Sequence, residues 1–328
     1  MFQADGVEIL VLVESWVDML LADQEPGEGS THCVSRAGLV HHFDPKLVPP
    51  QAENGISLLV RARRGRHEHV TLFDVGLTGT VLAHNISALG VDPRAIDHVV
   101  ISHGHPDHYG GITSLLGLVG RPVPVATHSD AFLPRYAVMG DGRASSFYNA
   151  AFNEADLTAA GGRPVLTRAP LELGWGVLTT GEIPRKVDFE GPRPPASPRA
   201  AGLYQVHADG SFGLDEVWDE QGLVIDVRDE GLVVLTGCAH AGVVNTVLRA
   251  RELAGDKPIR AVMGGFHLGF PTTPAENVGK TLDALAELDV GMIMPMHCSG
   301  LRAHTAFSTS LGDRYVQPSV GTVLRFGR

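Results

Sequence analysis

The sequence predicts an α/β protein in which two β-sheets are sandwiched between helices. Short β-rich segments dominate the chain, segments with helical spacing of apolar residues alternate with them, and no internal repeat interrupts the pattern. A hydrophobic fraction of 44% over 328 residues is enough for a substantial core. That length could hold one large domain or two ordinary ones.

The first half of the chain alternates strands and helices. Residues 56–62 and 69–75 are β-rich and flank a basic turn at 63–66, which predicts a hairpin. Apolar residues recur at helical spacing over 79–89, and a buried strand at 97–102 leads through a histidine-rich loop to a helix at 110–118. We expect function at the carboxyl end of that strand, because open α/β sheets usually place ligands there.

The middle of the chain is less regular. We expect a strand at 122–127, a helix or lid over 143–157, and an exposed loop at the proline-rich segment 191–202. Residues 128–222 as a whole are interpreted as an inserted segment that covers the active site.

Regular structure returns near the C-terminus. The pattern predicts strands at 223–227, 232–236, 259–263, 292–296 and 320–326, and helices at 243–253 and 274–288.

Charge and cysteine content narrow the class of protein. The 37 acidic and 26 basic residues leave a net charge of -11, which argues against nucleic acid or an anionic membrane as a partner. Three cysteines are too few for a disulfide framework, so we expect a cytoplasmic protein. No apolar stretch reaches membrane-spanning length. The partner expected is a small-molecule substrate, and the oligomeric state is left open.

The strongest chemical signal is the run His103-Gly104-His105-Pro106-Asp107-His108. Packing does not explain three imidazoles and a carboxylate within six residues, whereas zinc and its first-row neighbours prefer such donors. On an extended loop His103 and His105 would point the same way and share one metal. Asp107 and His108 would then serve a second metal nearby.

This run, placed after a buried strand, resembles the signature of the metallo-β-lactamase superfamily. The resemblance implies a single domain over residues 1–328, built as an αββα sandwich with metal ions at one edge. The segment Leu72-Phe73-Asp74-Val75-Gly76 is similar to the superfamily's upstream motif, which implies that Asp74 orients a metal-binding histidine.

Later motifs resemble one branch of that superfamily more closely. They are Gly181-Glu182-Ile183-Pro184-Arg185, Gly237-Cys238-Ala239-His240-Ala241-Gly242, Gly264-Gly265-Phe266-His267-Leu268 and Pro295-Met296-His297-Cys298-Ser299-Gly300. The branch contains the archaeal dihydropterin–ribofuranosylaminobenzene-phosphate synthases of methanopterin biosynthesis and many uncharacterised hydrolase-like proteins. The motifs identify the branch and leave the substrate open.

The remaining metal ligands are assigned from these later motifs. His240 and His297 follow predicted strands and are expected to be ligands, and His297 matches the superfamily's last ligand histidine. Cys238 aligns with the usual bridging aspartate. It is interpreted either as a thiolate ligand or as a small buried residue beside the ligands. The superfamily's Gly-His-Thr motif is absent, so His240 or His267 must complete that shell or one metal is held loosely.

His267 follows the predicted strand 259–263. We rank it first as a proton donor or substrate contact, and alternatively as a sixth ligand or a hydrogen-bonded turn residue. Arg185 and Lys186 are candidates for holding an anionic substrate group, and a surface basic pair is an equally good interpretation.

The leading functional hypothesis is a hydrolase that uses two divalent metal ions, zinc by default with manganese or iron as alternatives. Asp107 would bind metal and orient the attacking hydroxide, and His267 would assist. The substrate expected is a small anionic ester such as a phosphoester or a lactone. The alternatives are a pterin-related synthase of the branch's known type, and a non-catalytic sensor that binds its ligand at the metals.

Overall fold

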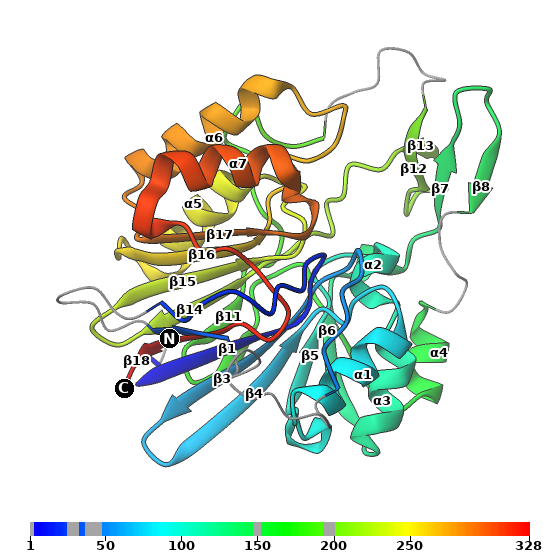
Figure 1. The fold of residues 1–328 in the computed structure, drawn as a ribbon. Coiled ribbons are helices and arrows are strands. Elements are labelled where there is room, and N and C mark those ends of the chain that lie inside the picture. Colours follow the sequence, from blue (N-terminus) through cyan, green and yellow to red (C-terminus); the bar gives the residue numbers. More distant parts are fainter. Residues whose placement is uncertain (1–2, 25–32, 37–47, 147–151, 193–200) are drawn as a thin grey trace.

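The structure confirms the αββα sandwich. The computed structural model describes residues 3–24, 33–36, 48–146, 152–192 and 201–328. Two mixed β-sheets face each other, and helices cover the outer face of each (Figure 1). None of the helices in this described part is long and apolar enough to cross a bilayer.

The first sheet has eight strands in the order β2-β18-β1-β3-β4-β5-β6-β9. In that order the strands are Cys33–Ser35, Val323–Gly327, Gly6–Val13, Ser57–Arg64, His67–Phe73, His98–Val100, Val123–Thr127 and Gly162–Leu166. The predicted hairpin is β3–β4, closed by a two-residue turn in which Gly65 adopts a positive φ of 59°. Strands β4, β5, β6 and β9 run parallel, so their carboxyl ends lie at one edge.

The second sheet has six strands in the order β10-β11-β14-β15-β16-β17. These are Glu172–Gly174, Val177–Thr179, Leu223–Val227, Gly231–Thr236, Ile259–Gly265 and Met292–Met296. Strands β15, β16 and β17 are parallel, so their carboxyl ends also lie together.

Helices cover the outer faces of the two sheets. The helices α1 (Gly79–Ala88), α2 (Pro106–Tyr109), α3 (Ile112–Val119) and α4 (Glu154–Ala159) lie beside the first sheet, and α5 (Val243–Ala254), α6 (Ala275–Glu287) and α7 (Gly300–Leu311) beside the second (Figure 1).

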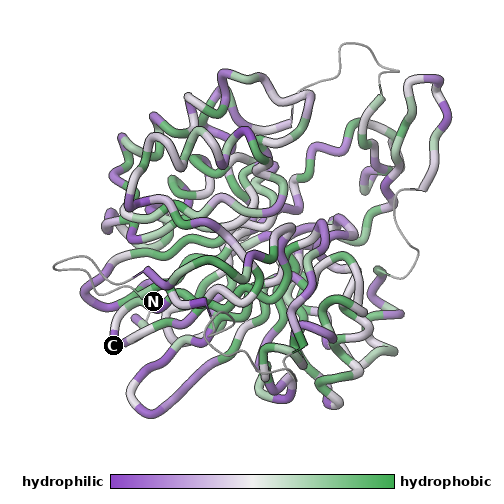
Figure 2. The backbone as a smooth tube through the Cα atoms, viewed as in Figure 1, coloured by the Kyte–Doolittle hydropathy of each residue, from purple (hydrophilic) through white to green (hydrophobic). Residues whose placement is uncertain are grey.

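Three apolar clusters correspond to these layers. Along β1, Ile9 and Val11 point into the cluster between the sheets, whereas Leu10 and Leu12 point into the cluster under α1 and α3. Because both faces of this strand are covered, its sequence is almost continuously apolar. Figure 2 shows the hydrophobic stretches following the strands at the centre of the molecule.

A third, four-stranded sheet stands apart from the sandwich (Figure 1). Its order is β13-β12-β7-β8, and the strands are Phe212–Leu214, Gly202–Val206, Arg135–Val138 and Ala144–Ser146. Within the predicted insertion 128–222, β9, β10 and β11 belong to the two main sheets instead, because each extends an edge of the sandwich.

The helix or lid predicted over 143–157 is wrong for its first part, because residues 144–146 pair with β7 as strand β8. Only 154–159 are helical, and 147–151 lie outside the described residues. The loop predicted at 191–202 also falls largely outside them, since 193–200 are not described.

The buried face of α7 contains a titratable residue, His304, which is 4% exposed. Its Nδ1 lies 3.0 Å from the hydroxyl of Tyr315. Burial lowers the pKa of His304 to about 4, because the charged ring would lose its hydration.

We predict that His304 makes folding stability depend on pH. An unfolded histidine titrates near 6.5, so between pH 6.5 and 4 the unfolded chain binds more protons, and stability falls as pH falls through that window. The full effect is about 3 kcal/mol at pH 4. Urea unfolding of the wild type and His304→Gln across this window should give a shallower pH slope for the variant. Equal slopes would contradict the assignment.

Candidate metal centre

The candidate site lies where strand tips from both main sheets meet. Asp74 follows β4, residues 102–108 follow β5, and His240, His267 and His297 follow β15, β16 and β17. Parallel strands bring these tips to one edge of each sheet, and the facing sheets bring the two edges together. Histidines far apart in the sequence therefore converge.

The histidine-rich run forms a bend followed by one helical turn. His105 is extended and caps α2, and Pro106 occupies the first helical position, where its fixed φ is favourable. The extended loop expected from the sequence is therefore correct only for His105, because residues 103 and 104 lie in a bend. The donor atoms of His103 and His105 fall in one candidate group and those of Asp107 and His108 in another, so the division between two metals expected from the sequence stays a prediction that this geometry is compatible with.

The first group of candidate ligands is His103, His105 and His240. One donor atom of each lies within 4.8 Å of the others. The Nε2 atoms of His103 and His240 are buried and have no hydrogen-bond partner. Burial, helped by the neighbouring histidines, lowers the pKa of both rings well below its usual value, so both are neutral and able to bind a metal.

The second group is Asp107, His108, Cys238 and His297, whose donor atoms also lie within 4.8 Å of one another. His108 Nε2 is 3.1 Å from Cys238 Sγ, and His297 Nε2 is 3.2 Å from Asp107 Oδ2. Burial alone would raise the pKa of Asp107, but the adjacent His108 and His297 outweigh it and hold that pKa below its usual range. The carboxylate is therefore ionised.

Both groups fit transition-metal ions. Their nitrogen, oxygen and sulfur donors are those of zinc and its neighbours, and buried imidazole nitrogens without partners are costly unless something binds them. The two groups are adjacent, because the ring centroids of His103 and His108 are 4.1 Å apart. Cys238 lies among the donors of the second group, which is the thiolate alternative considered above.

Asp74 lies against the ring of His108, and its role in orienting a metal ligand stays a prediction. Its Oδ2 lies 2.6 Å from His108 Nδ1, and it accepts hydrogen bonds from Ser102 N and Ser102 Oγ, both at 2.7 Å. The carboxylate thus holds the ring so that Nε2 faces the second group. A carboxylate on the far nitrogen of a ligand histidine fixes its orientation and raises its basicity.

We predict that Asp74→Asn lowers the affinity for zinc by about ten- to a hundredfold. Competition with a chromophoric chelator measures this affinity. Asp97→Asn is a suitable control, because Asp97 accepts a hydrogen bond from Val70 N but belongs to neither ligand group. Equal affinity in Asp74→Asn and the wild type would contradict the role of Asp74.

Two buried glutamates that sequence reasoning missed support the strand tips. Glu14 accepts hydrogen bonds from His297 N at 2.9 and 3.1 Å, and Glu220 accepts from His240 N at 2.7 Å and Ala241 N at 2.6 Å. Burial raises the pKa of Glu14 to about 8 and that of Glu220 to about 7. A charged residue directly after the apolar run of β1 was a signal for Glu14, whereas nothing in the sequence distinguished Glu220.

The backbone at these strand tips is strained. Asp74, Ala239, His267 and His297 have φ values between 47° and 57°, a left-handed conformation that costs non-glycine residues of order 1–3 kcal/mol each. Such strain persists only where surrounding contacts enforce it. The backbone hydrogen bonds to Glu14 and Glu220 supply part of that enforcement.

His267 lies beside both groups but belongs to neither. Its ring stacks on Phe270 with centroids 4.3 Å apart and contacts His240 at 4.2 Å. Burial lowers the pKa of His267 to about 3. The neutral ring can still donate a hydrogen bond through its N–H, so a role as donor or substrate contact stays a prediction.

Arg185 and Lys186 are not brought to the site. The Arg185 guanidinium lies 3.9 Å from the Trp218 ring centroid and donates to the carbonyl of Glu216, while Lys186 pairs with Glu252. Neither lines the pocket beside the metal centre. The surface interpretation of Lys186 fits the structure better, and the anion-binding role expected for the pair lacks support.

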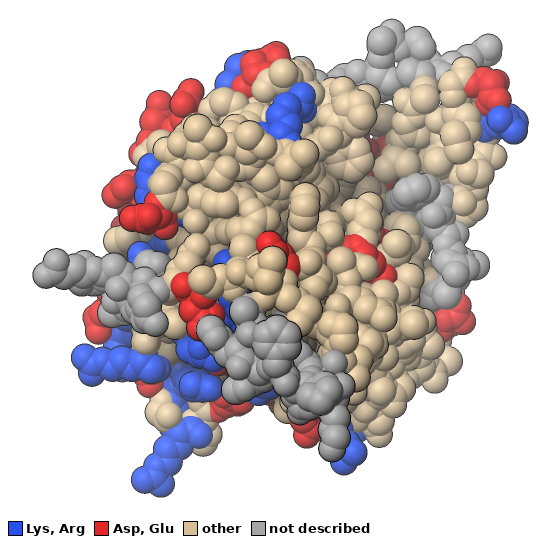
Figure 3. All heavy atoms as spheres, in the orientation of Figure 1, with Lys and Arg blue, Asp and Glu red and all other residues tan. Residues whose placement is uncertain are grey.

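A pocket of about 880 Å³ opens over both ligand groups. His105, Asp107, Cys238, His240 and His267 form its base. Most other walls are apolar, and they include Phe189, Leu203, Leu214, Val217, Phe266, Leu268 and Phe270. No lysine or arginine lines it among the described residues. On the face drawn in Figure 3 the basic side chains also lie mostly around the margin.

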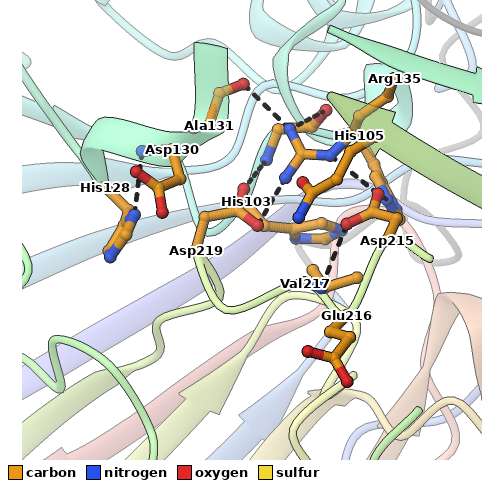
Figure 4. Close-up of polar contacts among 12 residues, drawn as sticks. His103, His105, His128, Asp130, Ala131, Arg135, Asp215, Glu216, Val217 and Asp219 are labelled. Carbon is orange, nitrogen blue, oxygen red and sulfur yellow. Dashed lines mark hydrogen bonds and ion pairs between the residues drawn. The ribbon is translucent and has the colours of Figure 1, made fainter. Parts of the chain in front are cut away.

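Sequence reasoning also missed a buried cluster behind His105. It consists of Arg135, Asp215 and Asp219, each at most 4% exposed (Figure 4). Asp215 Oδ2 lies 3.3 Å from His105 Nε2, and Arg135 connects the two carboxylates. Nothing in the sequence distinguished these residues. They lie in or next to the third sheet, whereas the residues that they contact, Gly104 and His105, follow a strand of the first sheet.

Comparisons with known proteins found similarities over most of the chain. A family model described as the metallo-β-lactamase superfamily matches residues 54–297. The chain is 31% identical over 280 residues to a 7,8-dihydropterin-6-methyl-4-(β-D-ribofuranosyl)-aminobenzene-5'-phosphate synthase of Methanocaldococcus jannaschii, covering 85% of this chain and 92% of that one.

Two further similarities cover most of the chain. An uncharacterised protein of the same archaeon is 28% identical over 277 residues, covering 83% of this chain and 93% of that one. A solved structure described as a metal-dependent hydrolase of the β-lactamase superfamily is similar with a TM-score of 0.69 and 25% identity, covering 98% of this chain and 100% of that one.

Proposed function

Because this chain belongs to the metallo-β-lactamase superfamily, we propose that it is a metal-dependent hydrolase acting on a small anionic ester of the phosphoester or lactone type. The observation that carries the proposal is the pair of adjacent donor groups at the base of one pocket. Similarity to a solved metal-dependent hydrolase over 98% of the chain supports it.

The donor sets suggest which residues hold which ion. His103, His105 and His240 would hold one divalent cation, and Asp107, His108, Cys238 and His297 the other. Zinc suits both sets best, and manganese or iron would satisfy most of the same ligands. When bound, such cations lower the pKa of a shared water towards neutrality and neutralise negative charge on the group under attack.

The protein's own groups orient the reactants. Asp107 is ionised and reaches the pocket, so it can accept a hydrogen bond from the nucleophile as well as bind metal. The ring of His267 contacts that of His240 and lines the pocket, so it can donate a hydrogen bond to the leaving group. The apolar walls exclude water from the reacting centre, which strengthens these interactions.

The pocket also limits where substrate charge can lie. With no lysine or arginine among its described lining residues, the metal ions would be the partners of an anionic group. The rest of the substrate would then be neutral and largely apolar. We further propose that the third sheet and the segment 201–217 form the cover expected from the sequence, since Leu203, Leu214 and Val217 line the pocket.

We predict that His105→Ala and Asp107→Ala abolish turnover and lower metal content, while circular dichroism shows a retained fold. Each change deletes one donor from a different group. Activity is measured with a panel of phosphodiesters, phosphomonoesters, lactones and carboxyl esters, and metal content by elemental analysis. His84→Ala is the control, because His84 contacts Pro49 O outside both groups. Retained turnover in either site variant would refute the hydrolytic proposal.

A second candidate function is a pterin-related synthase, favoured by the similarity to the archaeal synthase over 92% of that protein. In that case the metal centre would stabilise an anion or orient a phosphate, without delivering hydroxide. Binding of a reduced pterin, followed by fluorescence and thermal stabilisation, separates the two candidates. No response across a pterin panel, together with ester turnover, would favour the hydrolase.

A further inference from the structure

The second histidine of the metal-binding loop is held by a buried charge network. Asp215 Oδ2 lies 3.3 Å from His105 Nε2, so that nitrogen faces a carboxylate. With Nε2 turned to Asp215, His105 would offer Nδ1 to a metal in the first donor group. Asp74 on His108 has the same arrangement with the two nitrogens exchanged.

Arg135 fixes the position of Asp215. This fully buried arginine donates from Nε to Asp215 Oδ2 at 2.8 Å and from Nη2 to Asp219 Oδ1 at 2.5 Å (Figure 4). Asp215 also accepts a hydrogen bond from Val217 N at 3.1 Å. Both carboxylates are therefore held from more than one side, and the guanidinium geometry determines their separation.

The same network holds the backbone next to His105. Asp219 Oδ2 accepts a hydrogen bond from Gly104 N at 2.8 Å, and Arg135 Nη1 lies 3.4 Å from Gly104 O. A Cβ at position 104 would meet Ala131 O at 2.1 Å and Arg135 Nη1 at 2.3 Å. The glycine between the two histidines is therefore required, because the backbone carbonyl of Ala131 and the guanidinium of Arg135 both pack directly against it.

The charges of the network favour a neighbouring cation. When His105 is neutral, as metal binding requires, one guanidinium between two carboxylates leaves an excess of one negative charge, buried beside the first donor group. A buried charge without a counter-charge is costly, and a cation at His103, His105 and His240 would supply one.

The network also joins the metal loop to the third sheet. Arg135 begins β7, and Asp215 follows β13 directly. Leu214, Asp215 and Val217 line the pocket. One short segment therefore contributes both a pocket wall and the carboxylate that contacts His105.

We propose that Asp215, held by Arg135 and Asp219, is a positioning residue that orients His105 for metal binding and sets the affinity of the three-histidine group. This inference rests on the proposed metal binding. It gives a reason for the position of Arg135, Asp215 and Asp219. These buried residues come from the third sheet and the segment after it, and they contact the loop that carries His103 and His105.

Metal titration of Asp215→Asn tests the proposal. The substitution keeps the shape and the acceptor for Val217 N but removes the charge that faces His105. Titration of metal-free protein with Co²⁺, and Zn²⁺ competition with a chelator, should show binding at one group weakened at least about tenfold. The sulfur-to-cobalt charge-transfer band expected from Cys238 should persist, because Asp215 does not contact the second group.

The control is Asp226→Asn. Asp226 is also a buried carboxylate, 1% exposed, and pairs with Lys257 at 2.5 Å away from the donor groups. The Asp226→Asn variant should have a lower melting temperature but unchanged metal affinity at both groups.

A second variant serves if Asp215→Asn does not fold. Asp215→Glu keeps the charge but displaces the carboxylate by one methylene, and it should weaken metal binding at the same three-histidine group.

The outcomes separate this inference from the proposed function. A wild type that takes up neither Co²⁺ nor Zn²⁺ overturns the metal-dependent function itself. A wild type that binds both ions, with a folded Asp215 variant of unchanged affinity, overturns only the positioning role. Equal loss of binding at both groups would also overturn it, because that result indicates general destabilisation.

Discussion

The main constraint on this structure is that several buried imidazole rings must point their nitrogen atoms into the same small space between the two sheets' strand tips. Such nitrogens have lost water as a partner, and the Nε2 atoms of His103 and His240 have no protein partner in exchange. Burial keeps these rings neutral, which preserves the lone pairs that a cation would use. The surrounding carboxylates and the strained strand tips follow from the need to hold this arrangement in place.

Carboxylates hold the site from three directions. Asp74, from the first sheet, fixes the ring of His108, while Asp215 reaches His105 from the connection after the third sheet. Glu14 and Glu220 hold backbone N–H groups at the tips that carry His297 and His240. Two imidazole rings and two strand tips are therefore held by acceptors, and the ligand geometry does not rest on side-chain packing alone.

The sequence suggested that basic side chains would bind an anionic group of the substrate, but none of the lysines or arginines of the described residues lines the pocket. Arg185 and Lys186 were candidates for an anion site because they follow a motif of the branch, yet Arg185 stacks on Trp218 and Lys186 pairs with Glu252. Recognition of negative charge would then fall to the metal centre, and the apolar walls would recognise the remainder of the substrate. This division suits either an ester hydrolase or a synthase, since both need one anionic group held beside a largely apolar body.

Local patterns determined much of this protein. Continuous apolar runs marked the covered strands β1 and β15 because residues on both faces of those strands are buried, and the density of donors in 103–108 indicated a metal site because packing does not require such residues. Tertiary structure alone decided which group His240, His297 and Cys238 each join. It alone also decided the contacts of Arg135, Asp215, Glu14 and Glu220. The physical reason is the separation along the chain between residues that contact each other. A strand, or a cluster of metal-binding residues such as 103–108, is determined by residues that are neighbours in the sequence. An acceptor 110 positions away from its histidine is brought there only by the pairing of sheets.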